Sequence, residues 1–315
     1  MSALIQACDV SASVKNTGLE CNAAMGVTAM FLAAPMAFRF SLADIADIEE
    51  AVADAIAADR GARIYPIFGN AAPIGGITNN NEADVTETLP NGQVIPIRPG
   101  YINRDFFTIA GGLCYADHLR SFLGSGYGVF EIDQNGQFLA KKYTANDGTV
   151  SYGPLTATLT PRSPTFADYT QVYKNNFTVS YNPGEFLGSA TILKGAINLL
   201  DVTGLLDVVL TLPAAASTTI IKVKAATECA GSDLYDLYDT ELADVDAWII
   251  LNKATGVEVV PSSVTVDTVN HGWNLNGTFV SGETYTVALE TPANLRANVN
   301  FDGYESVAPI DVLIP

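Results

Sequence analysis

The 315-residue chain contains little charge, and little positive charge in particular. Charged residues make up 16% of the chain, whereas about 25% is usual in soluble domains. There are 16 Lys and Arg against 34 Asp and Glu, so the formal net charge is −18. This composition argues against binding to nucleic acids or anionic membranes, which requires clustered basic side chains. The low charged share indicates either a large core or a surface partly covered by other subunits.

Histidine and cysteine, which often carry catalysis or bind metals, are scarce. The chain has two histidines, His118 and His271, and no pair of its four cysteines has the Cys-x-x-Cys spacing of a zinc site. Gly-x-Ser-x-Gly, His-Glu-x-x-His and Gly-Lys-Ser/Thr motifs are absent. Cys114 and His118 could form a dyad on one helix, but no orienting third group can be named. We therefore predict reduced, buried thiols, no catalytic residues, no cofactor, no metal site and no enzymatic activity.

Two turn-like motifs resemble ligand loops without meeting their requirements. Asp133 opens "DQNG", the start of a calcium loop, but no glutamate follows at the required position. Gly124, Gly126 and Gly128 suggest a phosphate loop, which would have to follow a strand and open a helix. Here "YADHLRSFL" predicts a helix before the glycines and "YGVFEID" a strand after them. A turn and a helix stop leading into a hairpin are the expected structures.

Long hydrophobic runs are also missing. The apolar segment Ala23–Phe38 has 16 residues and contains Pro35, whereas a membrane-spanning helix needs about 20 residues. The first residues lack the basic and apolar regions of a signal peptide. We predict no membrane anchor and synthesis in a reducing cytoplasm. The acidic run from Glu228 to Asp246 contains no base and predicts a solvated face, with a functional negative surface or a weak cation site as alternatives.

One segment has clear helical periodicity. Ser41 is a good N-cap, and Asp44 completes a capping-box-like pair three residues later. Apolar residues then recur every three or four positions, at Leu42, Ile45, Ile48, Val52 and Ile56. The pattern predicts a helix over residues 41–59, with its acidic residues mostly on the solvated face.

Almost all the remaining patterns predict strands and turns. We expect a mainly β chain with one clear helix: a β-sandwich or barrel-like domain over residues 1–212, a linker at 213–219 and an immunoglobulin-like β-sandwich at 220–315. A hairpin over residues 82–98 should project from the first domain, because its arms are polar. Its turn residues, Pro90, Asn91 and Gly92, are the candidate inter-subunit contact, and we expect the hairpin to be mobile in the free subunit.

Three stretches resemble structural proteins of tailed phages that infect Bacteroidetes. They are "RIYPIFGN", "LPNGQVIPIRPGYINRDFFTI" and "GGLCYADHLRSFLGSGYGVFEIDQNGQFLA". The carboxyl-terminal part, from "DLYDLYDTELADVDAW" to "GYESVAPIDVLIP", is similar to accessory sandwich domains on phage head and tail proteins. The resemblance identifies no site residues.

The resemblance implies a virion subunit, and we favour the tail tube. In this interpretation the chain forms stacked homo-oligomeric rings, expected to be hexameric, and contacts other tail proteins. Its location is the virion tail after synthesis in the host cytoplasm. An acidic lumen would let DNA pass without specific binding, because it repels phosphates. The alternatives are a capsid or head-decoration protein and a cell-surface adhesin-type β protein.

Overall fold

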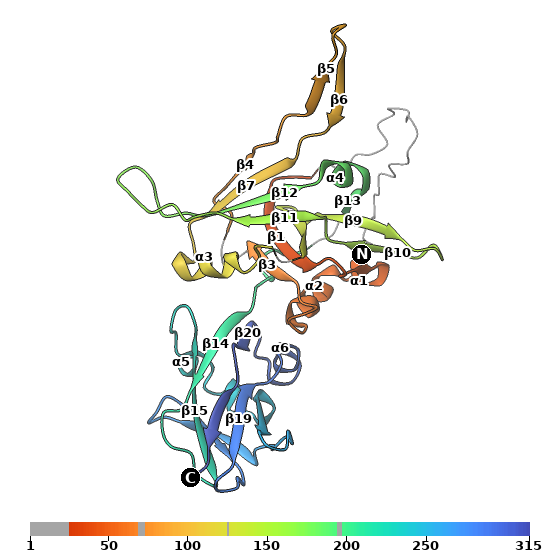
Figure 1. The fold of residues 1–315 in the computed structure, drawn as a ribbon. Helices are drawn as coiled ribbons and strands as arrows, with labels where there is room; N and C mark the ends of the chain where they lie inside the picture. Colours follow the sequence, from red (N-terminus) through yellow and green to blue (C-terminus); the bar gives the residue numbers. More distant parts are fainter. Residues whose placement is uncertain (1–24, 69–72, 125, 194–196) are drawn as a thin grey trace. The chain divides into compact units, whose positions relative to one another are not determined.

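The computed structural model of the protein describes residues 25–68, 73–124, 126–193 and 197–315. Cys8, Cys21 and the segment considered for a signal peptide lie outside these residues. Strands outnumber helices, which confirms the prediction of a mainly β chain (Figure 1). The main division of the chain falls between Gly204 and Leu205 and separates a first unit from a second. None of the described helices is long and apolar enough to cross a membrane.

The first unit is built around two antiparallel sheets. The larger sheet has the order β2-β10-β9-β8-β1-β3, with β13 also paired to β9, and the smaller has the order β11-β12-β7-β4. A backbone bridge pairs Val129 of β8 with Leu155, which lies in the connection between the two sheets, and together the sheets form a half-barrel. The strands are β1 (Thr28–Pro35), β2 (Phe40–Ser41), β3 (Tyr65–Phe68), β4 (Gly76–Asn79), β7 (Ile102–Thr108), β8 (Tyr127–Asp133), β9 (Phe138–Thr144), β10 (Val150–Gly153), β11 (Ala157–Pro161), β12 (Asn175–Tyr181) and β13 (Ala190–Leu193).

An aromatic-rich core lies between these sheets. Phe31 of the larger sheet packs edge-on against Phe106 of the smaller sheet, with 4.3 Å between ring centroids. Phe130 follows Val129 on β8, and its ring meets Phe40 on the opposite face of the larger sheet. Strand β8 is therefore buried on both faces.

The segment expected to be one helix over 41–59 forms two helices, α1 (Leu42–Ala46) and α2 (Ile48–Ala57). The capping box is confirmed: the Asp44 amide donates to the Ser41 hydroxyl, and the Ser41 amide donates to the Asp44 carboxylate. The single long helix was wrong because Asp47, at φ −131° and ψ 61°, leaves the helical region and interrupts the hydrogen-bond ladder.

Two further helices belong to the first unit, α3 (Gly112–Arg120) and α4 (Pro183–Ser189). Helix α3 covers most of "YADHLRSFL", and β8 begins after Gly124 and Gly126 and includes Gly128, so the predicted helix-to-strand order is confirmed. Gly136, at φ 73°, closes the β8–β9 hairpin in a backbone region that favours glycine.

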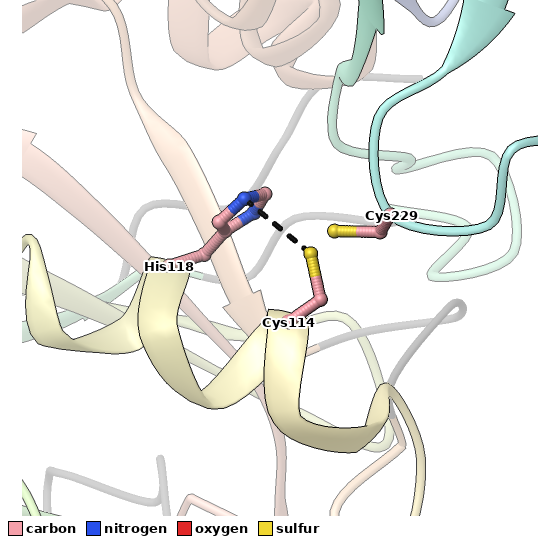
Figure 2. Close-up of side chains that lie close together, drawn as sticks. All are labelled: Cys114, His118 and Cys229. Carbon is pink, nitrogen blue, oxygen red and sulfur yellow. Dashed lines mark hydrogen bonds between the residues drawn. The ribbon is translucent and has the colours of Figure 1, made fainter.

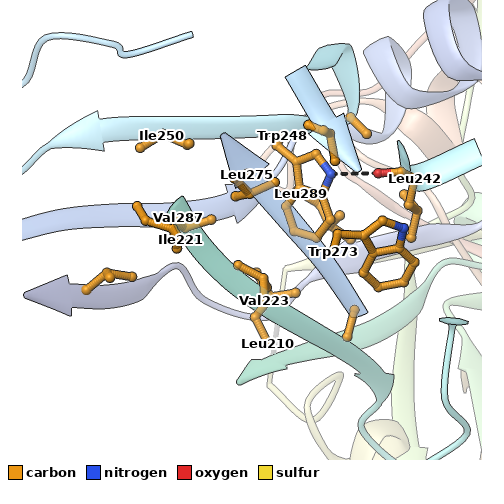
Figure 3. Packing of buried hydrophobic residues seen from close by; sticks show 14 of the residues in the cluster. Leu210, Ile221, Val223, Leu242, Trp248, Ile250, Trp273, Leu275, Val287 and Leu289 are labelled. Atoms are coloured by element: carbon orange, nitrogen blue, oxygen red, sulfur yellow. Dashed lines mark hydrogen bonds between the residues drawn. The ribbon is translucent and has the colours of Figure 1, made fainter. Parts of the chain in front are cut away.

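The second unit consists of two sheets around one hydrophobic cluster (Figure 3). The sheet orders are β17-β18-β15-β14-β20 and β16-β19-β21, and Trp248 and Trp273 are both buried in the cluster. The elements are β14 (Leu206–Thr211), β15 (Ile220–Thr227), α5 (Tyr235–Tyr238), η1 (Glu241–Ala243), η2 (Val245–Ala247), β16 (Trp248–Asn252), β17 (Ser263–Asp267), β18 (Gly272–Asn276), β19 (Thr284–Leu289), α6 (Pro292–Asn294), η3 (Leu295–Val299), β20 (Tyr304–Ser306) and β21 (Ile310–Leu313).

The predicted linker at 213–219 lies inside the second unit. Strand β14 precedes it and pairs antiparallel with β15, so residues 212–219 are a hairpin connection. Val208 and Leu210 of β14 are buried in the second unit's core, so the domain predicted to begin at residue 220 includes this earlier strand. Pro213 and the alanines after it have the composition of a linker, and local composition does not distinguish a linker from a hairpin loop.

Candidate functional site

The first candidate from the sequence is the pair Cys114 and His118. They lie one turn apart on α3, with 3.9 Å between Sγ of Cys114 and Nε2 of His118 (Figure 2). However, Cys114 and Cys229 are both disulfide-bonded, and the described part of the chain contains no free cysteine. The expectation of reduced thiols was therefore wrong for these two residues. Without a thiol, Cys114 cannot supply the thiolate nucleophile that a Cys–His dyad requires.

Histidine His271 has a local packing role in the second unit. It lies between β17 and β18 with φ 51°, and its ring lies over Tyr235 with 4.9 Å between ring centroids. Its Nδ1 is 3.9 Å from an Asp236 carboxylate oxygen on the exposed surface. Within either unit taken alone, the described His, Cys, Asp and Glu side chains form no group of three placed to hold a metal ion.

Aspartate Asp133, which opens the calcium-loop-like "DQNG", forms a backbone turn. Its carboxylate accepts hydrogen bonds from the amides of Gly26, Asn135 and Gln137, at 2.7 to 2.9 Å. The side chain is buried. Both carboxylate oxygens already accept backbone N–H groups, so Asp133 orders the hairpin, as the turn prediction requires.

The acidic run 228–246 contains backbone that supports the second core. The Trp248 indole N–H donates to the Leu242 carbonyl oxygen at 2.8 Å, and the Trp273 indole N–H donates to the Asp239 carbonyl oxygen at 3.0 Å. The run therefore does more than provide a solvated face, because its carbonyl groups accept the hydrogen bonds of both buried tryptophan N–H groups.

A buried polar cluster that the sequence did not reveal lies inside the half-barrel. Glu131 of β8 is fully buried and forms an ion pair with Arg104 of β7. Its carboxylate also accepts hydrogen bonds from the hydroxyls of Tyr181 and Thr28. Burial, followed by the nearby Glu131 carboxylate, holds the pKa of Tyr181 well above its usual value. Each side chain comes from a different strand, and every one has a partner, so the cluster fixes how the two sheets pack.

The predicted projecting hairpin is present. Strands β5 (Val85–Thr88) and β6 (Val94–Arg98) form a separate two-stranded sheet beyond β4 and β7 (Figure 1). The Gly92 amide donates to the Leu89 carbonyl oxygen at 2.8 Å, and Gly92 has φ 82°. Pro90, Asn91 and Gly92 thus form a three-residue hairpin loop, as predicted.

The stem of this hairpin is closely held. We call residues 80–101 the first arm. The two terminal guanidinium nitrogens of Arg98 donate to the Glu82 carboxylate at 3.1 and 3.2 Å, and the Gly100 amide donates to the Asp84 carboxylate at 2.9 Å. A Cβ at Gly100 would lie 2.0 Å from the Glu82 carbonyl oxygen, so only glycine allows the two chains of the stem to approach this closely.

Exposed apolar side chains distinguish β6, so the prediction that both arms of the hairpin are polar was wrong for this strand. Val94, Ile95 and Ile97 are all exposed. Successive residues of a strand point to opposite faces, so Val94 and Ile95 lie on opposite faces of the hairpin. Ile97 lies at a register shift, between the pairs Val85–Arg98 and Thr86–Pro96. A two-stranded hairpin is marginally stable in water, and this one has apolar side chains on both uncovered faces. These features are typical of a surface that a partner covers.

A second projection extends from the same small sheet. We call residues 162–174, which connect β11 to β12, the second arm. Backbone bonds between Thr165 and Lys174 hold its base, and the Phe166 and Tyr173 rings pack edge-on. Phe166, Tyr169 and Val172 are exposed around its tip. The sequence analysis did not predict this arm. Its sign in the sequence is that Phe166, Tyr169 and Val172, which are large apolar or aromatic residues, lie in an otherwise polar, turn-rich segment.

The two arms leave opposite ends of the small sheet. Strand β7 pairs with β12 from Ile102 opposite Tyr181 to Thr108 opposite Asn175. The first arm continues past the Ile102 end and the second past the Asn175 end (Figure 1). One subunit therefore presents apolar projections in two different directions.

These arms constitute the candidate site, a surface suited to contacts with other protein chains. Comparison with known protein families, curated proteins and solved structures finds no match to this chain.

Proposed function

We propose that this chain is a self-assembling structural subunit of a tailed-phage virion, and that it forms the stacked rings of a tail tube. The single observation that carries the proposal is the first arm, which exposes apolar side chains on both faces at the end of a well-held stem. Copies of the same chain cover these faces in the assembly, and the backbone edges of β5 and β6 pair with a neighbouring strand.

The composition of the chain supports an assembled state. A charged share of 16%, against about 25% in usual soluble domains, suits a surface that other copies partly cover. Burying arms between copies reduces the exposed apolar surface. The net charge of −18 suits an inner wall along which DNA moves without being held, because no counterions are released on contact.

In this proposal the second unit, which has two sheets around one hydrophobic cluster, is an immunoglobulin-like accessory domain. Its larger sheet contains a parallel pair, β14 with β20, beside antiparallel neighbours. We assign this unit to a peripheral position on the tube, where it contacts other virion proteins.

Negative-stain electron microscopy of the purified full-length chain tests the proposal. Tubes or six-fold rings support it, closed shells or trimers favour a capsid or head-decoration protein, and single particles that bind cell surfaces favour an adhesin-type protein. Persistently monomeric protein across the concentration range would contradict self-assembly.

A matched pair of triple variants tests the role of the first arm. Replacing Val94, Ile95 and Ile97 with Thr keeps β-branched strand formers while removing apolar surface. The control makes the same kind of change at Val257, Val260 and Val269, which are exposed positions of the second unit. The first variant should remain folded and fail to assemble, whereas the control should assemble like the parent.

A further inference from the structure

The tip of the second arm is a turn built around one carboxylate. Oδ1 of Asp168 accepts hydrogen bonds from the Thr170 amide and hydroxyl, both at 2.7 Å, and from the Gln171 amide at 2.9 Å. The Gln171 side-chain amide donates to Oδ2 at 3.0 Å. The Asp168 amide closes the turn by donating to the Gln171 carbonyl oxygen. Four hydrogen bonds to one exposed side chain order a loop that otherwise has little packing.

This turn holds a tyrosine in solvent. Tyr169 has a relative exposure of 109%, so its ring is fully accessible. Phe166 and Val172, at 65% and 57%, extend the apolar surface beside it. Tyrosine is enriched among residues that dominate protein interfaces, because it brings a large apolar ring and a hydroxyl group with few rotatable bonds. A turn that is already ordered reduces the entropy lost on binding.

We propose that the second arm is a second self-assembly contact, in which Tyr169 inserts into a neighbouring copy of this chain. The inference rests on the proposed self-assembly and adds a specific contact to it. The turn of Asp168 positions the ring, and Phe166 and Val172 cover the rim of the contact.

The placement of the arms favours a second copy of the chain as the partner. The first arm extends from one end of the small sheet and the second arm from the other. Two different projections at opposite ends lead to head-to-tail contacts, in which each copy meets one neighbour through each arm. The exposed Asp168 carboxylate at the tip is negatively charged, and a negative charge repels phosphate groups. The tip therefore fits an apolar protein surface better than a nucleic acid or an anionic membrane.

Site-specific photocrosslinking of the full-length chain tests the contact. A p-benzoylphenylalanine in place of Tyr169 is irradiated in assembled material, and the joined peptides are identified by mass spectrometry. The same probe in place of Val257, an exposed loop residue of the second unit, is the control. We expect a covalent dimer from position 169 that is absent at position 257. A crosslink only to another virion protein, or no dimer from position 169, overturns the inference.

A substitution gives an independent readout. Tyr169→Ser should raise the critical concentration for assembly by about 30-fold, as loss of a dominant interface side chain does. Val269→Ser, at another exposed position, should leave this concentration unchanged. If the parent assembles and Tyr169→Ser has no effect on the critical concentration, the second-arm contact is contradicted, whereas the proposed function is not. Failure of the parent itself to assemble would contradict both.

Discussion

Arg104 and Glu131 form an ion pair that ties the small sheet of the first unit to the large one. Glu131 is fully buried, whereas Arg104 retains some exposure. A carboxylate this deep is stable only while its charge is matched, and the hydroxyls of Tyr181 and Thr28 complete its hydrogen bonding. The stability of the half-barrel therefore depends on the charge of the Glu131 carboxylate.

Glu131→Gln should destabilise the first unit by about 3 kcal/mol, because it leaves the Arg104 charge without its partner. Guanidinium unfolding followed by circular dichroism measures the loss. Both tryptophans of the chain lie in the second unit, so the tryptophan fluorescence transition should not move. Glu87→Gln, on the exposed face of β5, is the control and should change neither transition. Equal shifts of the circular dichroism and fluorescence transitions would contradict a role of Glu131 that is confined to the first unit.

Gly100→Ala should disturb the first arm without unfolding the domain that carries it. The added methyl group would collide with the Glu82 carbonyl oxygen, so the stem must open and the hairpin must change direction. We expect loss of assembly with an unchanged thermal unfolding midpoint. Gly61→Ala, where a Cβ meets no atom within 4 Å, is the matched control and should assemble normally.

The carboxyl group of Asp168 should titrate well below a usual aspartate. Hydrogen bonds, led by that from the Thr170 side chain, lower its pKa to about 2. Because the pKa is depressed, the turn should be intact above pH 4 and lost as the pH falls through about 2. Carboxyl chemical shifts in an NMR titration measure this midpoint. Thr170→Val removes the strongest donor and should move the midpoint toward the usual aspartate value; an unchanged midpoint would show that the turn does not depend on this bond.

The second unit should fold alone only when β14 is included. A fragment of residues 205–315 contains every strand of the two sheets, whereas a fragment of residues 220–315 lacks a strand that lies between β15 and β20. We expect cooperative thermal unfolding with native-like tryptophan fluorescence from the longer fragment. The shorter fragment should aggregate or lack a transition, since it exposes the core that Val208 and Leu210 cover. Equal stability of the two would show that β14 is dispensable.

Local signals predicted the elements that depend on neighbouring residues. The capping box of Ser41 and Asp44 and the loop at Pro90–Gly92 need only a few adjacent positions, and both are present. The partnership of Glu131 with Arg104 depends on how two sheets pack, and no spacing along the chain indicates it. The hairpin connection at 212–219 was interpreted as a linker because small residues and proline suit both structures.

The second arm was missed for a related reason. Its composition of Pro, Thr, Asp and Gln is typical of any surface loop, and neither the exposure of Tyr169 nor the hydrogen bonds to Asp168 can be read from composition. The state of Cys114 was predicted wrongly as a reduced thiol, because spacing along the chain does not indicate oxidation.

The opposite placement of the two arms has a consequence for any polymer that this chain builds. Contacts that join unlike surfaces give the polymer a direction, so one terminus would end in unused first arms and the other in unused second arms. A protein that starts the polymer and one that stops it would then face chemically different ends. Growth could begin at one end and halt at the other without any change in the repeating subunit.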